Sequence, residues 1–183
     1  MQELILLKVA GFFIENPYTD IYLRELARKL KLSPFAAKKY ADMLAKEGLI
    51  KEDRKANLRY FRANTGSIFF RQLKVAFSIR LLAKSGLVEF LKENTPNVSS
   101  IVLFGSMARG EDDEKSDIDI LVIGKEKPEN FRKFEEKVNK EITVHVFSWS
   151  EWNKMAKEDS AFYSEVISHG IPLYGELPLV KWK

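Results

Sequence analysis

The stretch from Ile101 to Ile123, IVLFGSMARGEDDEKSDIDILVI, decides the fold of the C-terminal half of the chain. It reads as an apolar strand, a turn at Gly105-Ser106, a polar loop, and a second strand that carries Asp117 and Asp119. Residues two apart on a strand point to the same side of the sheet. The spacing therefore predicts that Asp117 and Asp119 present two carboxylates on one face.

Two such carboxylates repel one another, and each raises the pKa of the other unless a cation lies between them. Mg²⁺ is the expected cation, because it prefers oxygen ligands and completes its coordination with phosphates. Gly105 and Ser106 open a predicted helix through Arg109, and free backbone N–H groups at a helix start favour phosphate. A phosphate corner beside a carboxylate pair indicates phosphoryl or nucleotidyl transfer. The acidic run 111–114 is interpreted as a solvated loop.

At these residues the chain resembles the minimal nucleotidyltransferases of the DNA polymerase β superfamily, whose signature is Gly-Ser, a spacer, and Asp-x-Asp. Here the spacer is residues 107–116. The resemblance implies that Asp117 and Asp119 are catalytic and hold Mg²⁺, while Gly105, Ser106 and Arg109 bind a nucleoside triphosphate. It suggests ATP as the donor and a hydroxyl group as the acceptor. In some members the acceptor is a tyrosine of a partner HEPN-domain toxin, and the transferase is the antitoxin.

One position departs from that family. Active members place a third carboxylate on a later strand, and here the strand EITVHVF, residues 141–147, offers Thr143 as its best match. A neutral hydroxyl supplies neither the charge nor a strong proton acceptor. Glu141 and His145 share the strand parity of Thr143, and the longer reach of Glu141 makes it the better substitute. We therefore expect Mg²⁺-ATP binding with slow or absent transfer. His145 and His169 are otherwise interpreted as structural, and residues 169–172 are predicted to form a turn.

Composition and charge suggest two modules. The chain has 183 residues and 45% apolar content, enough for one domain or two small ones. It has no cysteine, which fits a reducing cytoplasm, and no apolar stretch long enough to span a membrane. Residues 1–66 hold 13 Lys and Arg against 8 Asp and Glu, whereas residues 67–183 hold 17 against 18. The basic first module is expected to have an anionic partner.

The first module resembles a winged helix-turn-helix, with three predicted helices followed by a β-hairpin. Ser33 and Pro34 form a strong helix start, and Gly48 ends the same helix. The outward side of this helix would enter a DNA major groove, and the hairpin would contact phosphates. The residues predicted to bind DNA are Lys38, Lys39, Arg54, Lys55 and Arg59, and Arg54 and Lys55 are expected at the tip of the hairpin. A protein-contact role, with the lysines merely solvated, is the alternative.

The predicted fold class is α+β: a winged helix-turn-helix over residues 1–66, linking helices over 67–95, and a polymerase-β-like nucleotidyltransferase domain with a small mixed sheet over 96–183. The helix 68–84 has more apolar residues than one face of an amphipathic helix can carry, so we expect it to be largely buried. It could pack between the modules or form a homodimer. Two rival functions remain at this point: a DNA-binding regulator whose second domain is inactive or senses nucleotide, and a protein-interaction module with neither activity.

Overall fold

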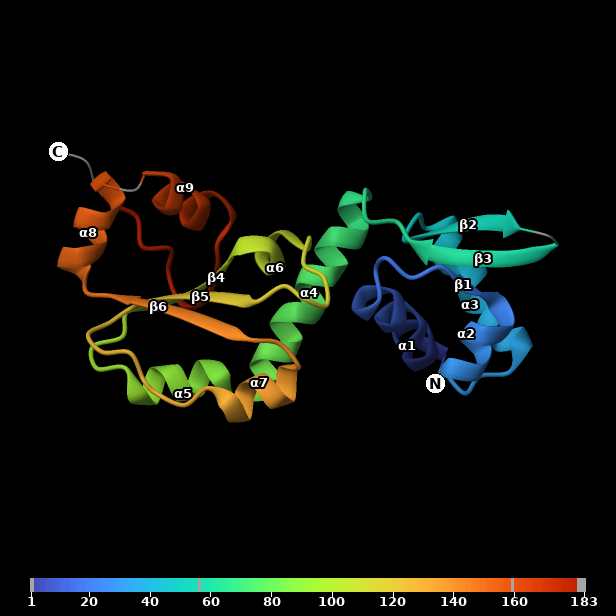
Figure 1. The fold of residues 1–183 in the computed structure, drawn as a ribbon, viewed down its shortest axis with the longest axis horizontal. Helices are drawn as coiled ribbons and strands as arrows, with labels where there is room; N and C mark the ends of the chain where they lie inside the picture. Colours follow the sequence, from blue (N-terminus) through green and yellow to red (C-terminus); the bar gives the residue numbers. More distant parts are fainter. Residues whose placement is uncertain (1, 56, 159, 181–183) are drawn as a thin grey trace. The chain divides into compact units, whose positions relative to one another are not determined.

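The computed structural model describes residues 2–55, 57–158 and 160–180 (Figure 1). The chain divides into two compact units, Met1–Phe77 and Ser78–Lys183. Within the described residues, no helix combines the length and the apolar character that crossing a membrane requires.

Among its described residues, the first unit contains a small antiparallel sheet, three complete helices, and residues 68–77 of a helix that continues into the second unit. The sheet has the order β1-β3-β2. The elements are α1 (Gln2–Glu15), β1 (Ile21–Tyr22), α2 (Leu23–Lys29), α3 (Pro34–Lys46), β2 (Ile50–Lys55) and β3 (Leu58–Ala63). Their order along the chain agrees with the helices and hairpin expected from the sequence.

Helix α3 begins and ends as its sequence predicts. The Ser33 hydroxyl accepts a hydrogen bond from the backbone N–H of Ala36 at 3.1 Å, and Pro34 occupies the first turn. Gly48 follows the helix with a φ of +72°, a conformation that glycine adopts without strain. The inward side of α3 packs into a core that contains Phe13, Leu26 and Phe61. The buried residues of α3 are Ala37, Tyr40, Ala41 and Leu44.

The hairpin strands are longer than their apolar residues indicate. Arg54 and Lys55 were expected at the tip, but both lie within β2 and pair with β3. Only Ile50 of β2 is buried, and the other five residues are exposed. Backbone pairing and ion pairs hold this strand, so hydrophobic alternation could not reveal its length.

Helix α4 (Ile68–Ser85) is less buried than its composition predicts. Phe70 joins the core of the first unit and Leu82 joins the core of the second. At the N-terminal turn, however, Ile68 and Phe69 are 69% and 51% exposed. The prediction of a largely buried helix is therefore wrong for this turn.

The second unit is built on a mixed sheet with the order β6-β5-β4-β7. Strands β4 and β5 are antiparallel, as are β4 and β7, whereas β5 and β6 are parallel. The elements are α5 (Leu87–Asn94), β4 (Ser100–Phe104), α6 (Gly105–Arg109), β5 (Ile118–Ile123), α7 (Arg132–Val138), β6 (Ile142–Phe147), α8 (Trp149–Glu158), α9 (Ser160–His169) and β7 (Ile171–Gly175).

Helices cover both faces of this sheet (Figure 1). On one face, apolar residues of β4, β5 and β6 pack against Leu87 and Leu91 of α5 and Phe134 of α7. On the other, Val102, Phe104, Leu121 and Ile123 pack with Trp152 of α8 and Val166 of α9. Residues of β5 alternate between the two cores, so Asp119 lies on the same side of the sheet as Leu121.

The C-terminal strand β7 was not expected. The sequence from 169 to 172 indicated a turn, because it contains Gly170 and Pro172. Instead, Ile171–Gly175 pairs with β4, with an irregularity in the register beside Val102. Since β7 is an edge strand, Pro172 can occupy it without breaking a central hydrogen-bond ladder.

Candidate active site

The turn between β4 and α6 meets the carboxylate of Asp119. Gly105 has a φ of +72°, and a Cβ atom added to it would lie only 2.4 Å from Asp119 Oδ2. Any other residue at 105 would therefore be strained and would displace the carboxylate. The register places Phe104 directly opposite Asp119 across the β4–β5 pair. The Gly-Ser turn and the second aspartate of the motif thus converge.

The two motif aspartates differ in environment. Strand β5 begins at Ile118, so Asp117 immediately precedes the strand and is exposed, while Asp119 is half-buried within it. Burial raises the pKa of the Asp119 carboxyl, and the negative charge of Asp117 raises that pKa further. This electrostatic conflict is what two neighbouring carboxylates produce when no cation offsets them.

Thr143 is the register partner of Asp119 in the parallel β5–β6 pair. It is the position where sequence reasoning placed the missing third carboxylate. Glu141 precedes β6 and is exposed, and its backbone carbonyl accepts a hydrogen bond from the N–H of Ile118 at 2.9 Å. Glu141 and Asp117 therefore lie side by side along the backbone, at the end of the strands where the motif aspartates lie.

His145 belongs to the same side of β6 as Thr143. Its ring lies 5.8 Å from that of Phe104 and 5.6 Å from that of Phe162, between centroids. Its positive charge, when present, lowers the pKa of Asp119. These ring contacts are consistent with a packing role, and they place the imidazole near the carboxylate pair.

Arg109 is bound to carboxylates of its own chain. Its Nε donates to Glu111 at 2.8 Å, and its guanidinium also forms an ion pair with Glu165 of α9. The hydrogen bond to Glu111 is the main reason that the pKa of Arg109 is raised. Glu165 in turn lies 3.2 Å from His169 Nδ1. Sequence reasoning missed Glu165, because no local motif marks this residue of a later helix.

The donor set fits magnesium. Among residues 2–55, 57–158 and 160–180, no group of three or more His, Asp and Glu side chains is arranged to hold a metal ion. Mg²⁺ needs no such group, because it keeps several waters and binds through one or two carboxylates plus substrate phosphates. Asp117 and Asp119 could supply those carboxylates, and their mutual repulsion favours a cation.

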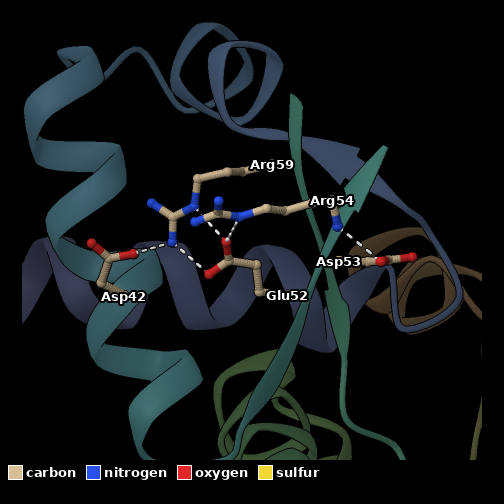
Figure 2. Close-up of polar contacts among 5 residues, drawn as sticks. All are labelled: Asp42, Glu52, Asp53, Arg54 and Arg59. Carbon is tan, nitrogen blue, oxygen red and sulfur yellow. Dashed lines mark hydrogen bonds and ion pairs between the residues drawn. The ribbon is translucent and has the colours of Figure 1, made fainter. Parts of the chain in front are cut away.

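In the first unit, Arg59 joins the hairpin to α3 (Figure 2). Its Nε and Nη2 atoms donate to the two oxygens of Glu52 at 2.7 and 2.6 Å, and Nη2 also donates to Asp42 at 2.5 Å. The bond to Arg59 holds the pKa of the Glu52 carboxyl below its ordinary value. This forked arrangement leaves Arg59 only 23% exposed.

The other cations predicted to bind DNA differ in availability. Lys55 forms an ion pair with Asp20 at 3.1 Å, and Arg54 lies 3.6 Å from Glu52 but remains 78% exposed. Lys38 and Lys39 are exposed on α3. Arg59 and Lys55 are thus engaged with acidic partners, whereas Lys38 and Lys39 are exposed to solvent.

Comparison with known proteins supports the C-terminal half of this description. Residues 84–171 match the family model described as "Nucleotidyltransferase domain". The chain is similar to two proteins of Methanocaldococcus jannaschii. It is 42% identical over 50 residues to "Putative protein adenylyltransferase MJ0141", covering 23% of this chain and 50% of that protein. It is 56% identical over 45 residues to "Putative protein adenylyltransferase MJ1215", covering 25% and 51%. The chain spans about half the length of the curated relatives it matches.

Two solved structures are also similar. One is described as "Crystal structure of the toxin-antitoxin with AMP-PNP", with a TM-score of 0.38 and 23% identity over 49% of this chain and 71% of that one. The other is a mutant of the toxin–antitoxin MntA-HpeT, with a TM-score of 0.36 and 20% identity over 49% of this chain and 70% of that one.

Proposed function

We propose that this protein is a magnesium-dependent nucleotidyltransferase that moves a nucleoside monophosphate from a nucleoside triphosphate to a hydroxyl acceptor. ATP is the proposed donor. The observation that carries the proposal is the approach of the Asp119 carboxylate to Gly105, with Asp117 close enough that its charge raises the pKa of Asp119. The match of residues 84–171 to the nucleotidyltransferase model supports it independently.

Each site residue has a proposed role. Asp117 and Asp119 would hold Mg²⁺, and the backbone N–H groups at Gly105 and Ser106 would bind the phosphates. When bound, the metal supplies positive charge that offsets the charge of the phosphates. The acceptor oxygen forms a bond to the α-phosphorus, the bond to the β-phosphate oxygen breaks, and pyrophosphate leaves. The hydroxyl proton passes to solvent or to Glu141, since Thr143 offers only a neutral hydroxyl.

The proposed role of Arg109 depends on whether its present partners release it. It was expected to neutralise phosphate charge, but Glu111 and Glu165 already bind its guanidinium. We infer that Arg109 reaches a nucleotide only by exchanging one of these partners. Its contribution to nucleotide affinity is accordingly smaller than that of Asp117 or Asp119.

The proposed acceptor is a protein. The relatives in M. jannaschii carry the name protein adenylyltransferase, which supports transfer of AMP to a protein hydroxyl. A HEPN-domain toxin is the proposed partner, with this chain as its antitoxin. The side-chain hydroxyl of a tyrosine on that partner would be the acceptor.

The test is incubation with ATP labelled at the α-phosphate, Mg²⁺ and candidate partner proteins. Label should appear on the partner with the wild-type chain and disappear with Asp117→Asn or Asp119→Asn. Glu114→Gln is the matched control, because it removes an exposed carboxylate of the same loop. Equal labelling by the wild type and both Asn variants would contradict the metal-site assignment.

We further propose that residues 1–66 form a winged helix-turn-helix that binds DNA. The order of α1, β1, α2, α3, β2 and β3, with the sheet order β1-β3-β2, supports this assignment. Two exposed lysines of α3, Lys38 and Lys39, are the proposed main contacts, with Arg54 reaching a phosphate from β2. Arg59 acts on DNA indirectly, because it neutralises Asp42 on the same side of α3.

Salt dependence tests this second role. The logarithm of the affinity should fall with the logarithm of salt concentration by about 0.9 per neutralised phosphate, so replacing Lys38 and Lys39 by Gln should flatten the slope by about 2. Replacing Lys154 and Lys157 of α8 by Gln is a control that removes the same charge. Binding that does not depend on salt, or no binding to genomic fragments, would favour a protein-contact role.

A regulator without transferase activity is the second candidate. Thr143 is the observation that favours it, because its neutral side chain stands in register with Asp119. Such a protein would bind Mg²⁺-ATP and alter its DNA affinity in response, without releasing pyrophosphate. Measuring pyrophosphate and DNA affinity in the same sample separates the two candidates.

A further inference from the structure

Lys140 is a nearly buried cation outside the sequence motif. It lies between α7 and β6, and its side chain is only 13% exposed. Burying a lysine is unfavourable unless its ammonium group finds charged or hydrogen-bonding partners. All its described partners lie in one segment, residues 112–116, which we call the acidic loop.

The ammonium group binds the acidic loop at three points. It donates to the backbone carbonyl of Asp113 and, at 3.1 Å, to that of Ser116. It also lies 3.4 Å from the carboxylate of Asp112, which is itself 6% exposed. Lysine has three N–H donors, so these contacts can satisfy the whole group.

The third contact reaches the residue beside the site. Ser116 immediately precedes Asp117, and the carbonyl that Lys140 binds belongs to the peptide bond joining the two. The acidic loop also has its own turn, in which the Asp113 side chain accepts from the N–H of Lys115 at 2.9 Å. That turn shapes the loop internally, whereas Lys140 fixes it to the start of β6.

Charge gives Lys140 a second effect. Residues 111–117, EDDEKSD, carry five carboxylates and one lysine. This concentration of negative charge favours an open loop, and a fixed ammonium group within it opposes that tendency.

We propose that Lys140 is a positioning residue that holds Asp117 beside Asp119, acting through the backbone of the acidic loop. It makes no contact with nucleotide in this role. The consequence for magnesium rests on the proposed function, whereas the consequence for the order of the loop does not.

Positioning of Asp117 and direct repulsion of the cation predict opposite results for magnesium. If Lys140 acted only by repelling Mg²⁺, its removal would strengthen Mg²⁺ binding, because a positive charge near the cation would be lost. If it positions Asp117, its removal should weaken Mg²⁺ binding by about 10- to 100-fold, the usual effect of removing a group that orients a metal ligand. The sign of the change therefore identifies the role.

The experiment compares the wild type with Lys140→Arg, Lys140→Met and the double variant Lys140→Met with Asp112→Asn. The double variant is decisive, because Lys140→Met alone leaves a buried carboxylate without this cation and could unfold the unit. Lys137→Met is the matched control: Lys137 donates to the carbonyl of Ser85 at 2.9 Å, away from the acidic loop.

Two measurements are made on each variant: amide hydrogen exchange over residues 112–118, and Mg²⁺ affinity by calorimetry. In the double variant we expect faster amide exchange in the acidic loop, unchanged amide exchange in the strands of the sheet, and weaker Mg²⁺ binding. Lys140→Arg and Lys137→Met should resemble the wild type.

Wild-type exchange and wild-type or stronger Mg²⁺ affinity in the double variant would overturn the proposal. Failure of the double variant to fold would also overturn it, because the proposed role is confined to the loop. A wild-type protein that binds no Mg²⁺ would refute the proposed function instead, and the exchange data would still decide the role of Lys140.

Discussion

The carboxylate pair should make the magnesium-free protein less stable than a variant that lacks one charge. Asp119 is half-buried and lies near Asp117, and both facts raise the pKa of its carboxyl. Between the ordinary carboxyl pKa and this raised value, the unfolded chain has lost its proton while the folded chain retains it. The free energy of unfolding therefore falls as pH rises through this interval, and the loss persists at neutral pH. Asp119→Asn removes that loss.

The expected gain is about 1 kcal/mol, since relieving one unfavourable charge commonly yields about 0.5–2 kcal/mol. For a chain of this size, 1 kcal/mol raises Tm by about 2–4 °C. Magnesium should make the wild type more stable than Asp119→Asn. At a concentration 100 times its Kd, a ligand stabilises the folded state by about 2.7 kcal/mol, and only the wild type should gain this.

Tryptophan fluorescence is a suitable probe, because the chain has three tryptophans and all lie in residues 78–183. Unfolding of wild type, Asp119→Asn and the control Glu114→Gln would be followed in EDTA and in Mg²⁺, from acidic to neutral pH. The wild type and Asp119→Asn should converge in acid and separate toward neutral pH. Equal stability of the two at neutral pH in EDTA would refute the electrostatic reasoning, and equal stabilisation by Mg²⁺ would refute the metal site.

Three further predictions concern other contacts. Gly105→Ala should lower the free energy of unfolding by about 1–3 kcal/mol and abolish Mg²⁺-ATP binding, because it forces a strained φ and displaces Asp119; wild-type calorimetric affinity would contradict this. Arg59→Gln should destabilise the first unit by about 1–2 kcal/mol in urea unfolding and weaken DNA binding, and adding Asp42→Asn should restore the binding. No restoration would mean that Arg59 contacts DNA itself. Thr143→Asp should raise pyrophosphate release; an unchanged rate would show that this position is not the missing carboxylate.

The strands and turn of the motif could be predicted from sequence because the signals are local. The apolar run that ends at Gly105-Ser106 defines β4 and the start of α6, and the apolar residues on both sides of Asp119 define β5. In α3, the Ser33 cap and Gly48 determine both ends through contacts within a few residues. Such features depend on residues that are close in the sequence, so they can be predicted from the sequence alone.

The partners of charged side chains could not be predicted in the same way. Arg59, Lys55 and Arg109 were all expected to face an anionic ligand, and each is bound to a carboxylate of the chain itself. The partner of Arg109 on α9 lies 56 residues away, and that of Lys55 lies 35 residues away. The sequence shows where a basic residue lies, but it does not show which acidic residue pairs with it. That partner depends on the tertiary structure.

Thr143 involves both a prediction from the sequence and a contact that only the tertiary structure shows. The resemblance to the nucleotidyltransferases predicted it as the position of the missing carboxylate, and the β5–β6 register pairs it with Asp119. A site with two carboxylates retains what magnesium binding needs, because phosphates and water can complete the coordination. What position 143 lacks is the negative charge of a third carboxylate and the proton acceptor that such a carboxylate would provide. We therefore predict that a neutral residue at 143 weakens nucleotide transfer much more than it weakens nucleotide binding.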